Sequence, residues 1–228
     1  MITHYKIYGE RCTGTNYLEE LISSNFDIEP SREGSHAGSK HFFGFNKLEN
    51  TDHVLFLCIV RNPVDWFNSI LKKPYHIPSE IYSKVPKFLN SEWYSIYNKP
   101  NQPLCGREII QDRNIYTGKR YKNIFELRHI KHKFLIDDLP TKVKNYILIR
   151  HEDLLNDFDN TMINIKNKGI PIKPDINFPI NIYWDCKKKN KKPLYNPDKS
   201  DDKPIKKKRI KNHKQFNDHY EKILNYNL

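Results

Sequence analysis

Short apolar runs alternate along the chain with segments whose apolar residues recur at helical spacing. The apolar runs occupy residues 4–8, 54–60 and 146–150. The helical pattern covers residues 17–25, 63–71, 122–136 and 151–169. The central run, VLFLCIV, is apolar at every position, which is typical of a strand that is buried on both faces of a parallel sheet. Strands that alternate with helices in this way predict an α/β fold.

The segments between these elements complete the predicted architecture. Residues 40–45 (KHFFGF) are interpreted as the end of a further strand, and residues 74–119, which contain five prolines, as an irregular helical insertion that carries a binding surface. At 228 residues the chain is long enough for one well-buried core. We therefore predict a single domain, residues 1–228, built on a P-loop-type parallel β-sheet flanked by helices in a three-layer α/β/α arrangement.

The segment GERCTGTNYL joins the first predicted strand to the first predicted helix. Gly9 and Gly14 have the spacing of a phosphate-binding P-loop, but Thr15 stands where a nucleotidase has its lysine. A strand, a glycine loop and a helix in this order direct backbone N–H groups and a helix N-terminus at an anion. The loop is therefore predicted to hold a phosphate group, although not the phosphates of ATP.

The most apolar run ends at Arg61, where a P-loop nucleotidase would place a metal-binding aspartate. This replacement argues against magnesium chemistry and predicts that a cation captures an anion directly. Pro63 is suited to open the following helix, and Ser69 lies eight residues after Arg61. Arg61 and Ser69 can therefore converge on one phosphate group. The alternative is an exposed arginine at a strand end and a serine on a helix surface.

The chain carries a formal net charge of +12 and has a pI near 9.4, which favours anionic partners such as nucleotides, acidic glycans or nucleic acid. The positive charge is densest at residues 187–211, predicted as a basic loop, and residues 212–227 are predicted as a C-terminal helix that docks on the core. Four widely spaced cysteines indicate a reducing compartment. Because the sequence has no signal-peptide pattern and no apolar run of membrane-spanning length, we expect a soluble, cytoplasmic protein without a membrane partner.

Three motifs together resemble one family. The three motifs are GERCTGTNYL before a helix, VRNPVDWFNSI after an apolar strand and ILIRHEDLL later in the chain. Together they are similar to motifs of the P-loop sulfotransferases that use PAPS (3'-phosphoadenylyl sulfate). The KHFF segment and the helical spacing of Phe216, Tyr220 and Leu224 also resemble this superfamily, which includes glycosaminoglycan sulfotransferases. The resemblance covers roughly half of the chain and does not extend to residues 74–119.

The resemblance implies a PAPS site without a metal, with PAP (3',5'-adenosine bisphosphate) as the product. The loop that would bind the 5'-phosphosulfate consists of Arg11, Cys12, Thr13, Gly14, Thr15, Asn16 and Tyr17. Arg61 and Ser69 would hold the 3'-phosphate. Three features depart from the family pattern. Cys12 stands two residues before the second glycine of the loop, where many members have a lysine, and Ser39 stands two residues before His41, where some relatives have a glutamate. Residues 187–211 would have to replace an absent glycine- and lysine-rich motif. The acceptor is unidentified, and a carbohydrate or small molecule is favoured over a protein.

Sulfuryl transfer requires in-line placement, a cation near the bridging oxygen and a base for the acceptor. Arg11 or Lys40 is the candidate cation for the leaving oxygen. His41 is the preferred base because histidine ionises near neutral pH, and Glu10 is the second candidate. The alternative for His41 is a histidine that packs at a strand end.

Two other functions stay open, and the second of them has two forms. Thr15 and Arg61 both argue against a P-loop kinase or nucleotidase. A non-catalytic basic module could bind PAP or another polyanion through residues 187–211, but this segment lacks the interleaved aromatic residues of a single-strand binder, and nucleic acid is not an expected partner. A degenerate, inactive sulfotransferase is consistent with Cys12.

Overall fold

The computed structural model describes residues 1–31, 40–100, 103–182 and 204–228. The chain forms two compact units, each of which is discontinuous in sequence. Unit 1 comprises Met1–Arg61 and Phe134–Lys192, and unit 2 comprises Asn62–Lys133 and Pro193–Leu228. That the two units make up a single domain stays a prediction.

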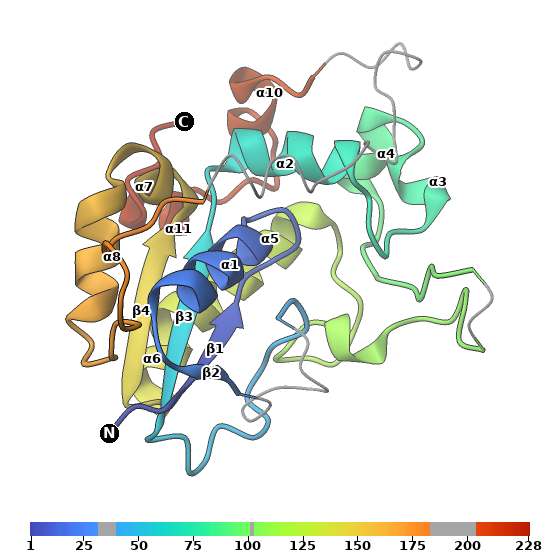
Figure 1. Cartoon of the computed structure of the whole chain (residues 1–228). Coiled ribbons are helices and arrows are strands. Elements are labelled where there is room, and N and C mark those ends of the chain that lie inside the picture. The colour runs from blue at the N-terminus through green and yellow to red at the C-terminus, as the bar shows by residue number, and fades with distance from the viewer. Residues whose placement is uncertain (32–39, 101–102, 183–203) are drawn as a thin grey trace. The chain divides into compact units, whose positions relative to one another are not determined.

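Unit 1 is built on a four-stranded parallel sheet (Figure 1). Its strands are β1 (His4–Tyr8), β2 (Glu29–Pro30), β3 (Val54–Val60) and β4 (Asn145–Arg150), in the order β2-β1-β3-β4. Three of them match the predicted apolar runs, so the predicted α/β class with a parallel sheet is confirmed. Tyr8 pairs with Cys58 and Val60 with Arg150, which brings the carboxyl ends of β1, β3 and β4 to one edge.

Helices α1 (Thr15–Asn25), α7 (His151–Asn156) and α8 (Phe158–Lys166) pack on one face of this sheet. The odd-numbered residues of β3, such as Leu57, join a buried cluster with Leu21 of α1 and Met162 of α8. Burial of one such side chain contributes about 1.5–3 kcal/mol. A shift of one residue would turn these side chains to the other face, so the cluster fixes the register of β3.

An aromatic cluster lies on the opposite face of the sheet. The ring of Tyr8 lies 5.2 Å from that of Phe43 and 5.6 Å from that of Phe56, and Phe43 stacks on Phe134 at 5.6 Å. Phe134 opens a π-helical segment, η3 (Phe134–Asp138), which continues into α6 (Leu139–Lys142). The two faces of β3 are therefore both buried, as its continuous apolar run predicts.

Three predicted elements between residues 40 and 169 differ in the structure. The strand end expected at residues 40–45 is wrong: these residues form bends, because β2 takes the place beside β1 and Phe43 is buried through its ring. The helix expected over residues 151–169 breaks at Asp157, whose φ of −141° and ψ of 51° are not helical. The helix expected over residues 122–136 is α5 (Ile124–Lys133), and η3 follows it.

Unit 2 contains short helices joined by irregular segments. They are α2 (Pro63–Lys72), α3 (Ser79–Tyr82), α4 (Val85–Asn90), η2 (Ile110–Asp112), α5, α10 (Lys207–Lys211) and α11 (His219–Ile223). Pro63 opens α2 as predicted, and Asn62 caps this helix by accepting a 3.0 Å hydrogen bond from the Asp65 amide. In place of the expected helix over residues 212–227 there is only α11. Residues 187–203 of the predicted basic loop lie outside the described residues, and its end forms α10.

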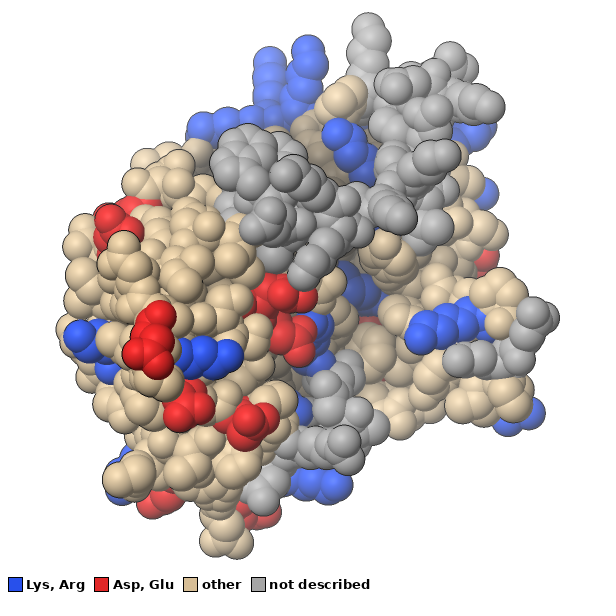
Figure 2. All heavy atoms as spheres, viewed as in Figure 1, with Lys and Arg blue, Asp and Glu red and all other residues tan. Residues whose placement is uncertain are grey.

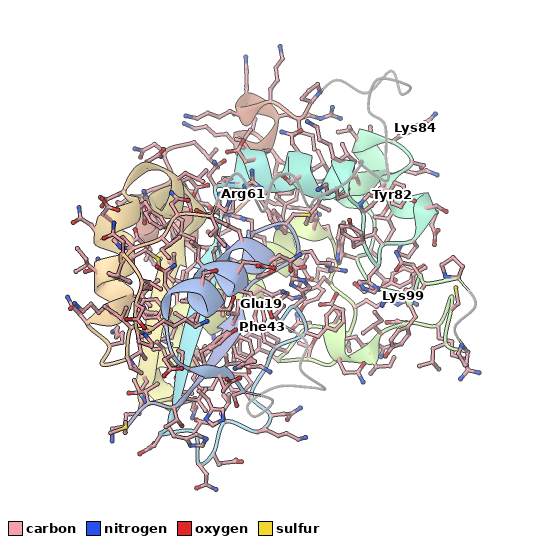
Figure 3. All side chains as sticks on the ribbon, in the orientation of Figure 1. Glu19, Phe43, Arg61, Tyr82, Lys84 and Lys99 are labelled. Atoms are coloured by element: carbon pink, nitrogen blue, oxygen red, sulfur yellow. The ribbon has the colours of Figure 1, made fainter. Side chains whose placement is uncertain are left out.

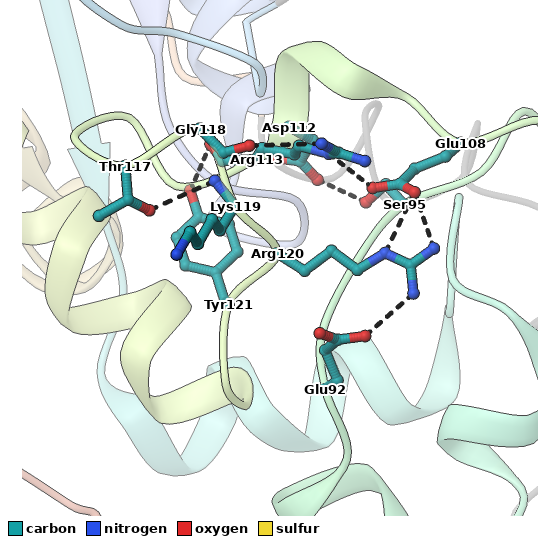
Figure 4. A network of polar contacts seen from close by, with 10 residues as sticks. All are labelled: Glu92, Ser95, Glu108, Asp112, Arg113, Thr117, Gly118, Lys119, Arg120 and Tyr121. Carbon is teal, nitrogen blue, oxygen red and sulfur yellow. Dashed lines mark hydrogen bonds and ion pairs between the residues drawn. The ribbon is translucent and has the colours of Figure 1, made fainter.

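Glu108 holds the insertion of unit 2 together (Figure 4). Its carboxylate accepts hydrogen bonds from Arg113 at 2.9 Å and from two nitrogens of Arg120 at 2.8 and 3.1 Å. Arg120 also donates to Glu92 at 2.9 Å, and its guanidinium stacks on the Tyr94 ring at 3.7 Å. The hydrogen bond from Arg120 is the main cause that lowers the pKa of Glu108 from 4.5 to about 2.

Glu108→Gln should make folding less sensitive to acid. Because the pKa of Glu108 in the folded state, about 2, lies below its ordinary value of 4.5, the ionised carboxylate stabilises the fold above pH 4.5, and this contribution is lost as the pH falls through about 2. We expect the melting temperature of the variant to be several degrees below that of the wild type at neutral pH. On acidification, the melting temperature of the variant should fall less than that of the wild type. Glu49→Gln, at an exposed position, is the control. Parallel melting curves for Glu108→Gln and the wild type would contradict the prediction.

Candidate functional site

The candidate site lies where the strand order of the sheet reverses. From β1 the chain passes through α1 to β2 on one side, whereas β3 pairs with β1 on the other side. In open parallel sheets, ligands bind at the carboxyl ends of the strands at such a point. Residues 9–14 follow β1 and Arg61 follows β3, so both predicted anion-binding elements lie at this edge of unit 1 (Figure 3).

The loop between β1 and α1 is a tight turn that opens the helix. The amide and the hydroxyl of Thr13 both donate to the Glu10 carbonyl, at 3.2 and 2.7 Å. Cys12 and Gly14 have positive φ angles of 65° and 103°, and backbone that alternates in this way can point neighbouring N–H groups at one anion. Because Gly14 is the N-cap of α1, the amides of the first helical turn have no carbonyl partner within the helix.

Both glycines of the loop are required by close contacts. A Cβ atom on Gly9 would lie 2.7 Å from Cγ2 of Ile59 and 2.8 Å from Oγ1 of Thr13. A Cβ atom on Gly14 would lie 2.4 Å from Cδ2 of His151, at a φ that favours glycine. His151 is not among the site residues predicted from the sequence. His151 comes directly after β4, just as Arg61 comes directly after β3. A position directly after a parallel strand is the sequence signal by which His151 could have been predicted.

Arg61 reaches from the end of β3 to the loop. Its Nη1 donates to the Cys12 carbonyl at 3.1 Å. The guanidinium is thus tied to the loop backbone, and it adds positive charge to that of the α1 N-terminus. Ser69, the predicted partner of Arg61, lies on α2 in unit 2, so their convergence on one phosphate stays a prediction.

Glu10 and Arg11, at the start of the loop, form a buried ion pair. The amide and Nε of Arg11 both lie 2.7 Å from Glu10 Oε1, and the side chains of Arg11 and Glu10 are only 3% and 8% exposed. The Arg11 guanidinium also lies 5.9 Å from the centre of the Phe42 ring. Glu10 therefore balances the charge of Arg11. This pairing competes with both predicted roles, Arg11 as the leaving-group cation and Glu10 as a base.

Lys40 and His41 lie beside the start of the loop. The Lys40 carbonyl accepts a 3.0 Å hydrogen bond from the Gly9 amide, and Lys40 Nζ lies 2.5 Å from Oε2 of Glu19 on α1. His41 Nδ1 lies 2.7 Å from the Gly9 carbonyl oxygen. Because a carbonyl oxygen only accepts, the proton of the neutral ring is assigned to Nδ1 and the basic lone pair to Nε2. His41 thus has the tautomer that a base acting through Nε2 requires.

The remaining predicted loop residues lie in the first turn of α1. Thr15 is buried and Asn16 is exposed. Tyr17 belongs to the hydrophobic core, and its hydroxyl donates to Oδ1 of Asn181 at 3.2 Å. The Tyr17 side chain therefore supports the core of unit 1, and its place in the site rests on its backbone.

No family model, curated protein or solved structure matches this chain. Within the residues that the structure describes, no three histidine, cysteine, aspartate or glutamate side chains are grouped so that they could hold a metal ion. In the same part of the chain, no helix combines the length and the apolar composition that crossing a membrane requires.

Proposed function

We propose that the chain is a PAPS-dependent sulfotransferase whose unit 1 is a P-loop-type, three-layer α/β/α core. It would bind the nucleotide at the loop after β1, transfer the sulfuryl group in line to a hydroxyl or amine, and release PAP. One observation carries the proposal. The hydrogen bond from Arg61 to the Cys12 carbonyl sets a cation against the loop, at the strand end where P-loop nucleotidases have a metal-binding aspartate.

The donors at this edge suit an anion. The first turn of α1 offers N–H groups together with the positive end of a helix dipole, and Arg61 offers a guanidinium. The carboxylate of the loop, Glu10, is balanced by Arg11 at 2.7 Å. Such a donor set fits the phosphates of PAPS better than a metal-bound triphosphate, which would need acidic ligands.

The backbone amides of the loop, Arg61, Ser69, His41 and one of the two candidate cations have distinct parts in the proposed reaction. PAPS, when bound, supplies an activated sulfuryl group. The amides after Gly14 would hold its 5'-phosphate, and Arg61 with Ser69 its 3'-phosphate. His41 Nε2 would accept the proton of the acceptor while Nδ1–H stays on the Gly9 carbonyl. Arg11 or Lys40 would stabilise the leaving oxygen after separating from its carboxylate partner.

PAP should raise the melting temperature more than 5'-AMP or ATP at equal concentration, because among the three it alone carries a 3'-phosphate. At 100 times its dissociation constant, a ligand stabilises the folded state by about 2.7 kcal/mol, which scanning fluorimetry detects. Arg61→Ala should abolish the preference, and Arg107→Ala, at an exposed position in unit 2, should keep it. Equal shifts from all three nucleotides would refute the cofactor proposal. A preference that survives in Arg61→Ala would mean that the 3'-phosphate is bound elsewhere.

An inactive PAP-binding protein is the second candidate. The pairing of both candidate cations favours it, since Arg11 lies 2.7 Å from Glu10 and Lys40 2.5 Å from Glu19. A screen of labelled PAPS against carbohydrate, peptide and small-molecule acceptors separates the two candidates. Transfer to any acceptor would support the enzyme, whereas PAP binding without transfer would support the inactive protein.

A further inference from the structure

Six exposed cations lie within nine residues, 206–214, of unit 2. This set, called the α10 surface below, consists of Lys206, Lys207, Lys208, Arg209, Lys211 and Lys214. Figure 2 shows lysine and arginine side chains standing out over α10 at the top of the view, with no acidic side chain beside them there. Among the described residues, none of the six is paired with a carboxylate: Asp218 pairs with Lys222 at 2.9 Å and Glu221 with Arg128 at 2.6 Å.

The segment that carries these cations is fixed to the rest of unit 2. Ile205 and Ile210 are 2% and 0% exposed. The Asn68 side chain on α2 donates to the Ile205 carbonyl at 2.9 Å and accepts from its amide at 2.8 Å. The His213 ring stacks on Phe125 of α5, with ring centres 4.3 Å apart. The cations thus form a fixed array. Because the segment is already ordered, binding a ligand to it costs less conformational entropy than binding the same ligand to a solvated tail.

No carboxylate within the described residues neutralises the positive field of this array. Burial lowers the pKa of His213, and the charges of Lys214 and Arg209 lower it further. Like charges crowded in this way repel one another, and an anionic partner relieves that repulsion. The array is therefore suited to a ligand that carries several negative charges.

We infer that the α10 surface binds an acidic polysaccharide, a linear polymer with sulfate or carboxylate groups. Five of its six cations are lysines, whose compact charges suit separate anionic groups rather than one bidentate partner. Ile205 and Ile210 are buried in the protein and so are not available for insertion into a bilayer. The rings of His213 and Phe216 pack on Phe125 and so offer no platform for nucleic-acid bases. Binding here needs no transfer chemistry, so the inference stands apart from the proposed function.

Replacing Lys207, Lys208 and Lys211 with glutamine tests the α10 surface and keeps the helix, since lysine and glutamine have similar helix propensities. The matched control replaces three exposed lysines of unit 1 whose side chains have no partner among the described residues. These are Lys142, Lys168 and Lys173. Each variant lowers the formal net charge from +12 to +9. The probe is a labelled heparin oligosaccharide, titrated at several salt concentrations.

We expect the α10 variant to bind the oligosaccharide about 10- to 100-fold more weakly, and the slope of log K against log salt to become shallower by about 2, because three ion contacts are lost. The control should stay within about threefold of the wild type. Equal losses in both variants would mean that net charge, not the α10 surface, holds the probe, and would overturn the inference. Tighter binding of single-stranded DNA or of phosphatidylserine vesicles, with the same dependence on these lysines, would also overturn it.

Two further measurements separate this surface from effects on folding and from the nucleotide site. If melting shows that the triple variant does not fold, a double variant with Lys206→Gln and Lys214→Gln takes its place, since both positions lie outside α10. This double variant must bind the oligosaccharide more weakly than the wild type. Unchanged binding would overturn the inference. Arg61→Ala should leave the affinity for the oligosaccharide unchanged even where PAP binding is lost. Displacement of the oligosaccharide by PAP would assign these cations to the nucleotide and overturn the inference.

Discussion

Replacing Glu221 with glutamine should lower the free energy of unfolding by about 3–5 kcal/mol. Glu221 on α11 accepts hydrogen bonds from Nε and Nη2 of Arg128 on α5, at 2.6 and 2.8 Å, and both side chains are only 3% exposed. Glutamine keeps the shape of the side chain but removes the carboxylate that balances a buried guanidinium, and this imbalance is the main cost. His132, 4.0 Å from the carboxylate, adds no compensating change, because burial and then the charge of Arg128 hold its pKa well below the usual value.

Two further variants separate the pairing of these charges from packing. Asp218→Asn breaks an exposed ion pair with Lys222 on α11, 2.9 Å long, and should cost less than about 1 kcal/mol. The double variant Arg128→Met with Glu221→Leu removes both buried charges and should recover most of the loss. Urea denaturation measures the free energy of unfolding of all three variants. The comparison is valid when the slope of this free energy against urea concentration is the same as in the wild type. If Glu221→Gln costs no more than Asp218→Asn, the buried pair does not hold α11 in place.

The long strands of unit 1 could be predicted from the sequence because their signals are local. An apolar run such as residues 54–60 is stable only in a sheet whose two faces are both covered. The strand expected at residues 40–45 failed for a different reason. Phe43 is buried by stacking on Tyr8 at 5.2 Å, and apolar content does not distinguish ring packing from strand pairing. β2 (Glu29–Pro30) was missed because two residues are too few for a periodic pattern.

In the candidate site, backbone features were easier to predict than charge pairs. Glycine spacing and the end of an apolar run locate the loop and Arg61, because both are properties of neighbouring residues. Adjacent charges such as Glu10 and Arg11 can diverge or pair, and the turn of the loop decides which, so their 2.7 Å contact was not predicted. The contact of His151 with Gly14 depends on the pairing of β4 beside β3, which connects residues far apart in the sequence.

His41→Ala should lower kcat/KM for sulfuryl transfer by about 10²- to 10⁴-fold and leave the stabilisation by PAP unchanged. The loss is expected because Nδ1–H is bonded to the Gly9 carbonyl at 2.7 Å, which makes Nε2 the basic atom. The measurement uses an acceptor found in the screen with labelled PAPS.

His41→Asn separates proton transfer from support of the loop. The asparagine amide can still donate to the Gly9 carbonyl but has no basic nitrogen, so we expect this variant to bind PAP as the wild type does and to be as inactive as His41→Ala. Activity restored by asparagine would mean that His41 only positions the loop. Glu10 would then be the next candidate base, but Glu10→Gln also breaks the buried pair with Arg11. A Glu10 variant that loses turnover and keeps its stabilisation by PAP, together with an active His41→Asn, would assign proton transfer to Glu10.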